Sequence, residues 1–145
     1  MQAARRRLST STSSSPDEQF KGATGLRRLV NASRNSIAGL RHALANEAAM
    51  RQEMLGFVVL TPVALLLSVP VLERLLLVLS MLLVLLTEFI NSAIEATIDR
   101  ISLERHPLSG RAKDLGSAAV AVALLMSALS WIVIAGPLLL RWLQR

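Results

Sequence analysis

The stretch LLLVLSMLLVLLTEFINSAIEATIDR, from Leu75 to Arg100, joins a strongly apolar run to a polar one without a break. From Leu75 to Thr87 only Ser80 and Thr87 are polar, which is typical of a helix that crosses a membrane. The residues that follow include three carboxylates. Charged groups are costly inside a bilayer. This segment therefore leaves the membrane, carries out chemistry, or does both.

The polar residues of this stretch share one face of the predicted helix. With 3.6 residues per turn they fall within about 100° of arc. They are Glu88, Asn91, Ser92, Glu95 and Asp99. A helix that merely emerged into water would be polar on all sides, so this face contacts protein, water or a bound substrate. Carboxylates inside membrane helices are usually functional, and paired carboxylates are natural ligands for Mg²⁺.

A purely structural network is the alternative interpretation of this face. In it, Glu88 bonds to Asn91, and Asp99 pairs with Arg100 or with an arginine of the following loop. The residue types and their spacing leave both interpretations open.

Composition bounds the class of protein. The chain has 145 residues, enough for one domain, and 52% of them are hydrophobic. The apolar residues gather in long blocks between Leu55 and Leu143, as in membrane helices. The chain has no cysteine, which excludes disulfides, thiolate catalysis and thiolate metal sites. With two histidines, a histidine-based zinc site is not expected.

The positive charge is concentrated on one side of the predicted membrane. Nine of the sixteen lysines and arginines lie in residues 1–53, and four more lie between the second and third apolar blocks. A pI of 11.4 is compatible with nucleic-acid binding. The positive-inside rule explains the placement better, so we expect no nucleic-acid partner. It predicts that the N-terminus and the loop between the second and third spans are cytoplasmic.

The chain begins with two segments of different character. Residues 1–20 are basic and serine-rich, and we expect a disordered extension. We assign residues 21–145 to a membrane domain, which starts with an amphipathic helix over about 25–50. Its arginines lie off an apolar stripe, which suits a helix on the membrane surface. Gly39 is a candidate kink in this helix.

Three membrane spans follow this helix, at about 52–69, 72–98 and 114–140. Pro62 interrupts the first span, and Pro70 with Glu73 and Arg74 marks a tight turn before the second. A loop over 101–111 contains Pro107 and Gly110, and we expect it to be non-helical. The predicted fold is an all-α membrane protein with a surface helix and three transmembrane helices.

Two further patterns each have a functional and an ordinary interpretation. In SGRAKD, residues 109–114, Gly110 and two cations precede a predicted helix, where backbone N–H groups favour an anion such as phosphate. The positive-inside rule alone also explains Arg111 and Lys113. Glu47 and Arg51 are four residues apart and fit a surface ion pair on a helix.

Three segments resemble the small bacterial integral-membrane diacylglycerol kinases. They are NEAAMRQE (46–53), EFINSAIEATIDR (88–100) and LSGRAKDLGSAAV (108–120), and the resemblance covers about residues 25–134. It implies a homotrimer in the bacterial inner membrane that transfers the γ-phosphoryl group of ATP to diacylglycerol. The product is phosphatidic acid, recycled in phospholipid metabolism, and Mg²⁺ is the cofactor.

The resemblance also implies roles for individual residues. Glu88 corresponds to the catalytic general base, and Glu47 and Glu95 to the Mg²⁺ ligands. The nucleotide-binding prediction comprises Arg28, Asn35, Glu47, Glu95, Glu104, Arg105, His106, Lys113 and Asp114. The prediction for the lipid substrate or its support comprises Arg51, Glu53, Arg74, Glu88, Asn91, Asp99 and Ser117.

Two other functions remain open from the sequence. Undecaprenol kinase uses the same scaffold, with a different lipid alcohol as acceptor. A small transport or channel subunit can also carry an acidic stripe on a membrane helix. Against transport, the acids cluster at one end of the span, and only Ser80 interrupts the apolar run before them.

Overall fold

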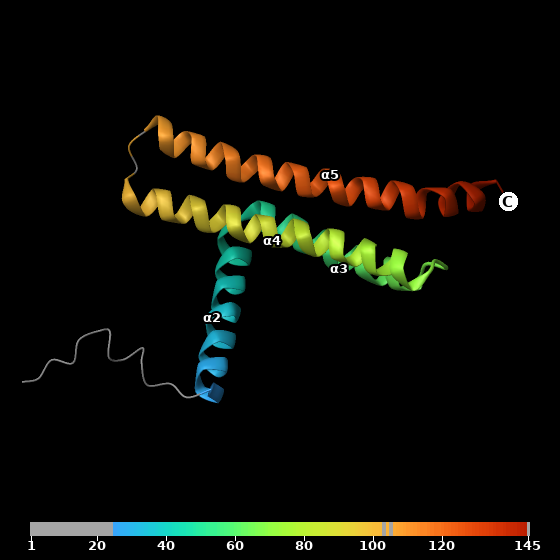
Figure 1. Cartoon of the computed structure of the whole chain (residues 1–145), viewed down its shortest axis with the longest axis horizontal. Helices are drawn as coiled ribbons and strands as arrows, with labels where there is room; N and C mark the ends of the chain where they lie inside the picture. The colour runs from blue at the N-terminus through green and yellow to red at the C-terminus, as the bar shows by residue number, and fades with distance from the viewer. Residues whose placement is uncertain (1–24, 103, 105, 145) are drawn as a thin grey trace, which may run out of the picture. The chain divides into compact units, whose positions relative to one another are not determined.

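The computed structural model describes residues 25–102, 104 and 106–144, and all regular structure within them is helical. The helices are α2 (Gly25–Asn46), α3 (Ala48–Leu66), α4 (Val71–Ile101) and α5 (Pro107–Leu143) (Figure 1). This confirms the all-α prediction. The predicted extension at 1–20 and Arg105 lie outside the described residues.

Three of these helices, α3, α4 and α5, are long and apolar enough to cross a membrane, as the sequence predicts. A helix rises 1.5 Å per residue, so the 31 residues of α4 extend about 46 Å, against a hydrocarbon layer of about 30 Å. Because α4 is longer than this layer, its apolar run can span the lipid while its polar end lies near the headgroups.

The start of α5 differs from the sequence prediction. The expected loop through Arg111 is wrong for residues 107–111, which are helical. Proline fits the first position of a helix, where its missing N–H is not needed. The Nδ1 atom of His106 caps this helix by accepting a hydrogen bond from the Leu108 backbone N at 3.2 Å. Pro107, which the sequence suggested as a helix breaker, is the first residue of α5.

The junction between α2 and α3 falls at Glu47, within the segment predicted to be continuous helix to about residue 50. Glu47 is extended, with φ −114° and ψ 122°. Arg51 Nη1 donates to the carbonyls of Leu44 and Ala45, both at 3.3 Å, and so satisfies two carbonyls at the end of α2. The expected Glu47–Arg51 ion pair is therefore wrong, because the arginine bonds to the backbone.

The α2 helix is continuous through Gly39, so this glycine does not divide it into two helices. Residues up to Gly39 form a unit separate from the one that begins at Leu40 and contains α3, α4 and α5. The large apolar side chains of α2 include Leu26, Leu29 and Val30, which are exposed. A position on the membrane surface remains a prediction for this helix.

Within the second unit, α3 and α5 both pack against α4, and α5 runs beside α4 (Figure 1). The buried residues of α4 recur at helical spacing along one face: Leu77, Met81, Val84, Leu85, Glu88 and Asn91. The same face is therefore apolar over its first part and polar from Glu88 onward. The polar residues continue the packing face of the helix.

Candidate functional site

The buried face of α4 carries two polar side chains at its polar end. Glu88 is 5% exposed and Asn91 is 9% exposed. Burying a carboxylate is costly unless it is paired, bonded or neutralised. The sequence prediction that this face contacts protein is confirmed for these two residues.

Glu47 reaches this face from the start of α3. It occupies the N-cap position, but its side chain makes no capping hydrogen bond to its own helix. Its Oε2 atom instead accepts a hydrogen bond from the Oγ of Ser92 on α4. The extended backbone at Glu47 thus places a carboxylate from α3 against α4.

Glu95 is held from within α4. The Nδ2 atom of Asn91 donates to its Oε1 at 3.1 Å. The structural alternative that bonded Glu88 to Asn91 is therefore not observed, since the amide is directed to Glu95. Glu47 and Glu95 each lie near enough to Glu88 for their charges to repel its charge, and these three residues are called the carboxylate cluster.

Glu53 is the fourth carboxylate near this cluster. It lies close enough to Glu88 for their charges to repel, and its Oε2 atom is buried without a hydrogen-bond partner. It lines a cavity of about 350 Å³, with Phe57, Leu60 and Met81 among the apolar walls. A carboxylate at one end of an apolar cavity suits a ligand with a polar head and an apolar tail.

The described residues provide no cationic partner for the cluster. Among the described residues the single ion pair joins Lys113 to Asp99, so Glu47, Glu53, Glu88 and Glu95 have none. In the same part of the chain, no three histidine, aspartate or glutamate side chains gather closely enough to hold a metal ion. Mg²⁺ is commonly bound by one or two carboxylates, waters and substrate phosphates. Two carboxylates can hold such an ion only together with other ligands, such as waters or phosphate oxygens.

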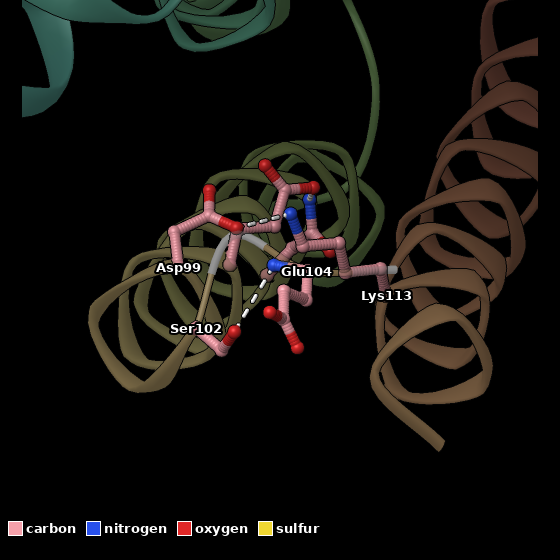
Figure 2. Close-up of polar contacts among 6 residues, drawn as sticks. Asp99, Ser102, Glu104 and Lys113 are labelled. Atoms are coloured by element: carbon pink, nitrogen blue, oxygen red, sulfur yellow. Dashed lines mark hydrogen bonds and ion pairs between the residues drawn. The ribbon is translucent and has the colours of Figure 1, made fainter. Parts of the chain in front are cut away.

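A second polar group lies where α4 ends and α5 begins. Lys113 Nζ on α5 is 2.6 Å from Asp99 Oδ1 on α4, and Figure 2 shows the lysine reaching across to the aspartate. The backbone N–H of Glu104 donates to Ser102 Oγ at 3.0 Å in the connection between the helices (Figure 2). Among the described residues Asp99 pairs with Lys113 and not with Arg100 or Arg111, while Arg105 lies outside them.

The remaining predicted site residues are distributed more widely. Arg74 lies near the opposite end of α4, where its Nη2 donates to the carbonyls of Leu67 at 3.0 Å and Val69 at 3.4 Å. The structure thus places Arg74 away from the carboxylates, as a support for the α3–α4 turn. Exposed predicted residues are Arg28 and Asn35 on α2, Arg51 on α3, Glu104 and His106 before α5, and Asp114 and Ser117 on α5.

Two residues of this region have contacts that the sequence prediction did not assign. Ser92 holds Glu47, although its place on the polar face was the only sign of a role. Gly116 on α5 lies directly against Asn91. Small residues at such a position permit close approach of two helices.

The chain is similar to known proteins over the segment that contains these carboxylates and Gly116. Residues 34–135 match the family described as prokaryotic diacylglycerol kinase. The chain is 56% identical to "Diacylglycerol kinase" of Pseudomonas aeruginosa over 115 residues, 79% of this chain and 94% of that protein. It is 46% identical to "Diacylglycerol kinase" of Escherichia coli K12 over 111 residues, 77% of this chain and 91% of the relative. It is 44% identical to the protein of that name in Haemophilus influenzae over 108 residues, 74% and 92% of the two chains.

Proposed function

Since this chain belongs to the prokaryotic diacylglycerol kinase family, we propose that it transfers the γ-phosphoryl group of ATP to the hydroxyl of diacylglycerol. The product is phosphatidic acid, and ADP leaves. The enzyme class follows from the family. The donor, the product and the residue roles below are our proposal.

One observation carries the assignment of the site. A membrane-crossing helix buries the carboxylate of Glu88, with Glu47 and Glu95 beside it and no cation paired to any of the three among the described residues. A lipid hydroxyl is confined near the membrane surface, and the polar end of α4 lies at the end of its apolar run. The position of these carboxylates at the end of the apolar run supports a site where a lipid alcohol and a soluble nucleotide meet.

Glu88 is the proposed general base. Its carboxylate accepts the proton of the diacylglycerol hydroxyl as that oxygen forms a bond to the γ-phosphorus. The bond from the γ-phosphorus to the oxygen shared with the β-phosphate breaks, and ADP leaves with the electron pair. A base must lie within hydrogen-bond reach of the proton that it removes. Glu53 and its apolar cavity, close to Glu88, are our proposed binding site for the lipid.

Glu47 and Glu95 are the proposed ligands of Mg²⁺. When bound, the ion neutralises the phosphate oxygens of ATP and the charge that develops on them. The two carboxylates come from different helices and are held by Ser92 and Asn91 respectively. These hydrogen bonds fix the direction in which each carboxylate presents its oxygens.

Lys113 is the proposed cation for the nucleotide phosphates. An ammonium group has three N–H donors, and Asp99 accepts one of them. The lysine can therefore keep Asp99 as an anchor while it donates to a phosphate. Further proposed nucleotide contacts are Arg28, Asn35, Glu104, Arg105, His106 and Asp114.

Assembly and orientation form part of the same proposal. We infer a homotrimer in the bacterial inner membrane, with the N-terminus and the α4–α5 connection in the cytoplasm. The excess of arginine and lysine in these segments supports this orientation. Cytoplasmic ATP then reaches the polar end of α4.

The experiment is a transfer assay on the purified full chain in mixed micelles with Mg²⁺ and labelled ATP. Diacylglycerol and undecaprenol are offered separately, with a third sample that contains no lipid alcohol. Labelled phosphatidic acid from diacylglycerol is the expected product. Label found only with undecaprenol contradicts the acceptor, and label in neither lipid from folded protein contradicts the kinase assignment.

A further inference from the structure

Asn91 on α4 lies directly against the backbone of Gly116 on α5. Both residues are buried. Among the described residues, the Oδ1 atom of Asn91 has no hydrogen-bond donor, although it is buried. Buried carbonyl oxygens are rarely left without a donor, so this atom needs an explanation.

Gly116 leaves room for that oxygen. A Cβ atom added at Gly116 would overlap Asn91 Oδ1 and would lie 3.3 Å from Asn91 Cγ. It would lie 3.8 Å from Asn91 Cα, which is ordinary contact. The backbones of the two helices therefore tolerate a methyl group, and only the amide of Asn91 occupies its place.

Glycine has a hydrogen in the direction in which other residues carry Cβ. At Gly116 this small group leaves the place where a side chain would stand to Asn91 Oδ1, the atom that an added Cβ would overlap. With Oδ1 against Gly116, the amide must turn its Nδ2 the other way. That direction is the one in which Nδ2 donates to Glu95.

We propose that Gly116 is a positioning residue that acts through Asn91 on Glu95 and so sets the affinity of the site for a divalent cation. The proposal rests on the proposed function, in which Glu95 holds Mg²⁺. Hydrogen bonds to metal ligands orient them, and their loss typically costs 10- to 100-fold in metal affinity. The absence of a side chain at Gly116 on α5 thus helps to orient the carboxylate of Glu95 on α4.

The test measures Mn²⁺ binding by electron paramagnetic resonance, on full-length protein in micelles with a non-hydrolysable ATP analogue. Gly116→Ala displaces the Asn91 amide and is expected to weaken Mn²⁺ binding about tenfold. Gly136→Ala is the matched control, since Gly136 is also inside α5 and has nothing within 4 Å of its added Cβ. The Mn²⁺ affinity of Gly136→Ala is expected to stay within about twofold of wild type. Both substitutions change helix propensity equally, so a difference between them reports the contact at Gly116.

A second background separates positioning from packing. In Asn91→Ala the amide is gone, so adding Gly116→Ala should change Mn²⁺ binding by less than about twofold. An equal loss in both backgrounds contradicts the proposal, because the glycine would then serve helix spacing alone. An unchanged affinity in Gly116→Ala also contradicts it.

The double variant also decides the case in which Gly116→Ala does not fold. The overlap is absent when Asn91 is alanine, so the double variant should fold and bind Mn²⁺ as Asn91→Ala does. A double variant that is itself unfolded contradicts the proposal. Failure of the proposed function is a separate result, seen as wild-type protein that binds Mn²⁺ but phosphorylates no lipid.

Discussion

The buried face of α4 has an apolar half, from Leu77 to Leu85, and a polar half, from Glu88 onward. The two halves differ in how their polar groups are paired. From Leu77 to Leu85 the face is apolar, and its interhelical polar contact is between Ser80 Oγ and Ser127 Oγ at 3.3 Å. Ser80 already donates to the Leu77 carbonyl at 2.8 Å, so Ser127 is the donor in this contact. The polar groups of this half satisfy one another.

The polar half leaves interactions open. The carboxylates of Glu47, Glu88 and Glu95 have no cation paired to them among the described residues. A purely structural network would pair these groups, as the serines are paired in the apolar half. The contrast supports our proposal that the polar half of the helix binds a ligand.

After replacement of the general base Glu88, the substitution with the largest expected effect on activity is that of Ser92. Ser92→Ala removes the donor that holds Glu47, so the Mg²⁺ concentration for half-maximal rate should rise about 10- to 100-fold. Transfer to diacylglycerol is measured across a Mg²⁺ titration. Ser130→Ala is the control, since Ser130 Oγ donates only to the carbonyl of Met126 in its own helix. An unchanged Mg²⁺ requirement in Ser92→Ala would contradict the role of this serine.

The apolar half should respond in stability alone. Ser80→Ala removes the contact with Ser127 and should lower the free energy of unfolding by about 0.6 kcal/mol, typical of hydrogen bonds between membrane helices. Reversible unfolding in detergent mixtures measures this change. The Mg²⁺ requirement should not move. A large loss of activity in folded Ser80→Ala would remove the distinction between the two halves.

The smallest effect is expected for the ion pair at the end of the polar half. The side chains of Lys113 and Asp99 are 37% and 51% exposed, so water and salt screen their attraction. A double-mutant cycle measures the free energy of unfolding of Lys113→Met, Asp99→Asn and the double variant. The coupling between the two side chains should be about 0.5 kcal/mol or less at physiological salt. A coupling above about 2 kcal/mol would show a rigid structural pair and would contradict a lysine that also serves phosphate.

The membrane helices could be predicted because their signals are local. Long apolar runs mark the spans, and the spacing from Glu88 to Asp99 places the polar residues on one face. The start of α5 was missed because Pro107 also fits a loop. Only the cap from His106 decides that it begins a helix.

The contacts of the site depend on which helices pack together, which spacing within one helix does not state. Arg51 is four residues from Glu47, yet its guanidinium bonds to the Leu44 and Ala45 carbonyls where α2 ends. Ser92 meets Glu47 only because α3 packs on α4. Gly116 was visible as a small residue, but its role needs the position of the Asn91 amide.

The most direct test of the central claim compares two glutamates of the same helix, Glu88 in the polar half and Glu73 in the first turn of α4. Each is replaced by glutamine in the full chain, and the rate of phosphoryl transfer to diacylglycerol is measured with saturating ATP and Mg²⁺. Loss of a general base should slow Glu88→Gln by about 10²- to 10⁴-fold, while Glu73→Gln stays close to wild type. A folded Glu88→Gln within about threefold of wild type, or an equal loss in both variants, would contradict a general base at Glu88.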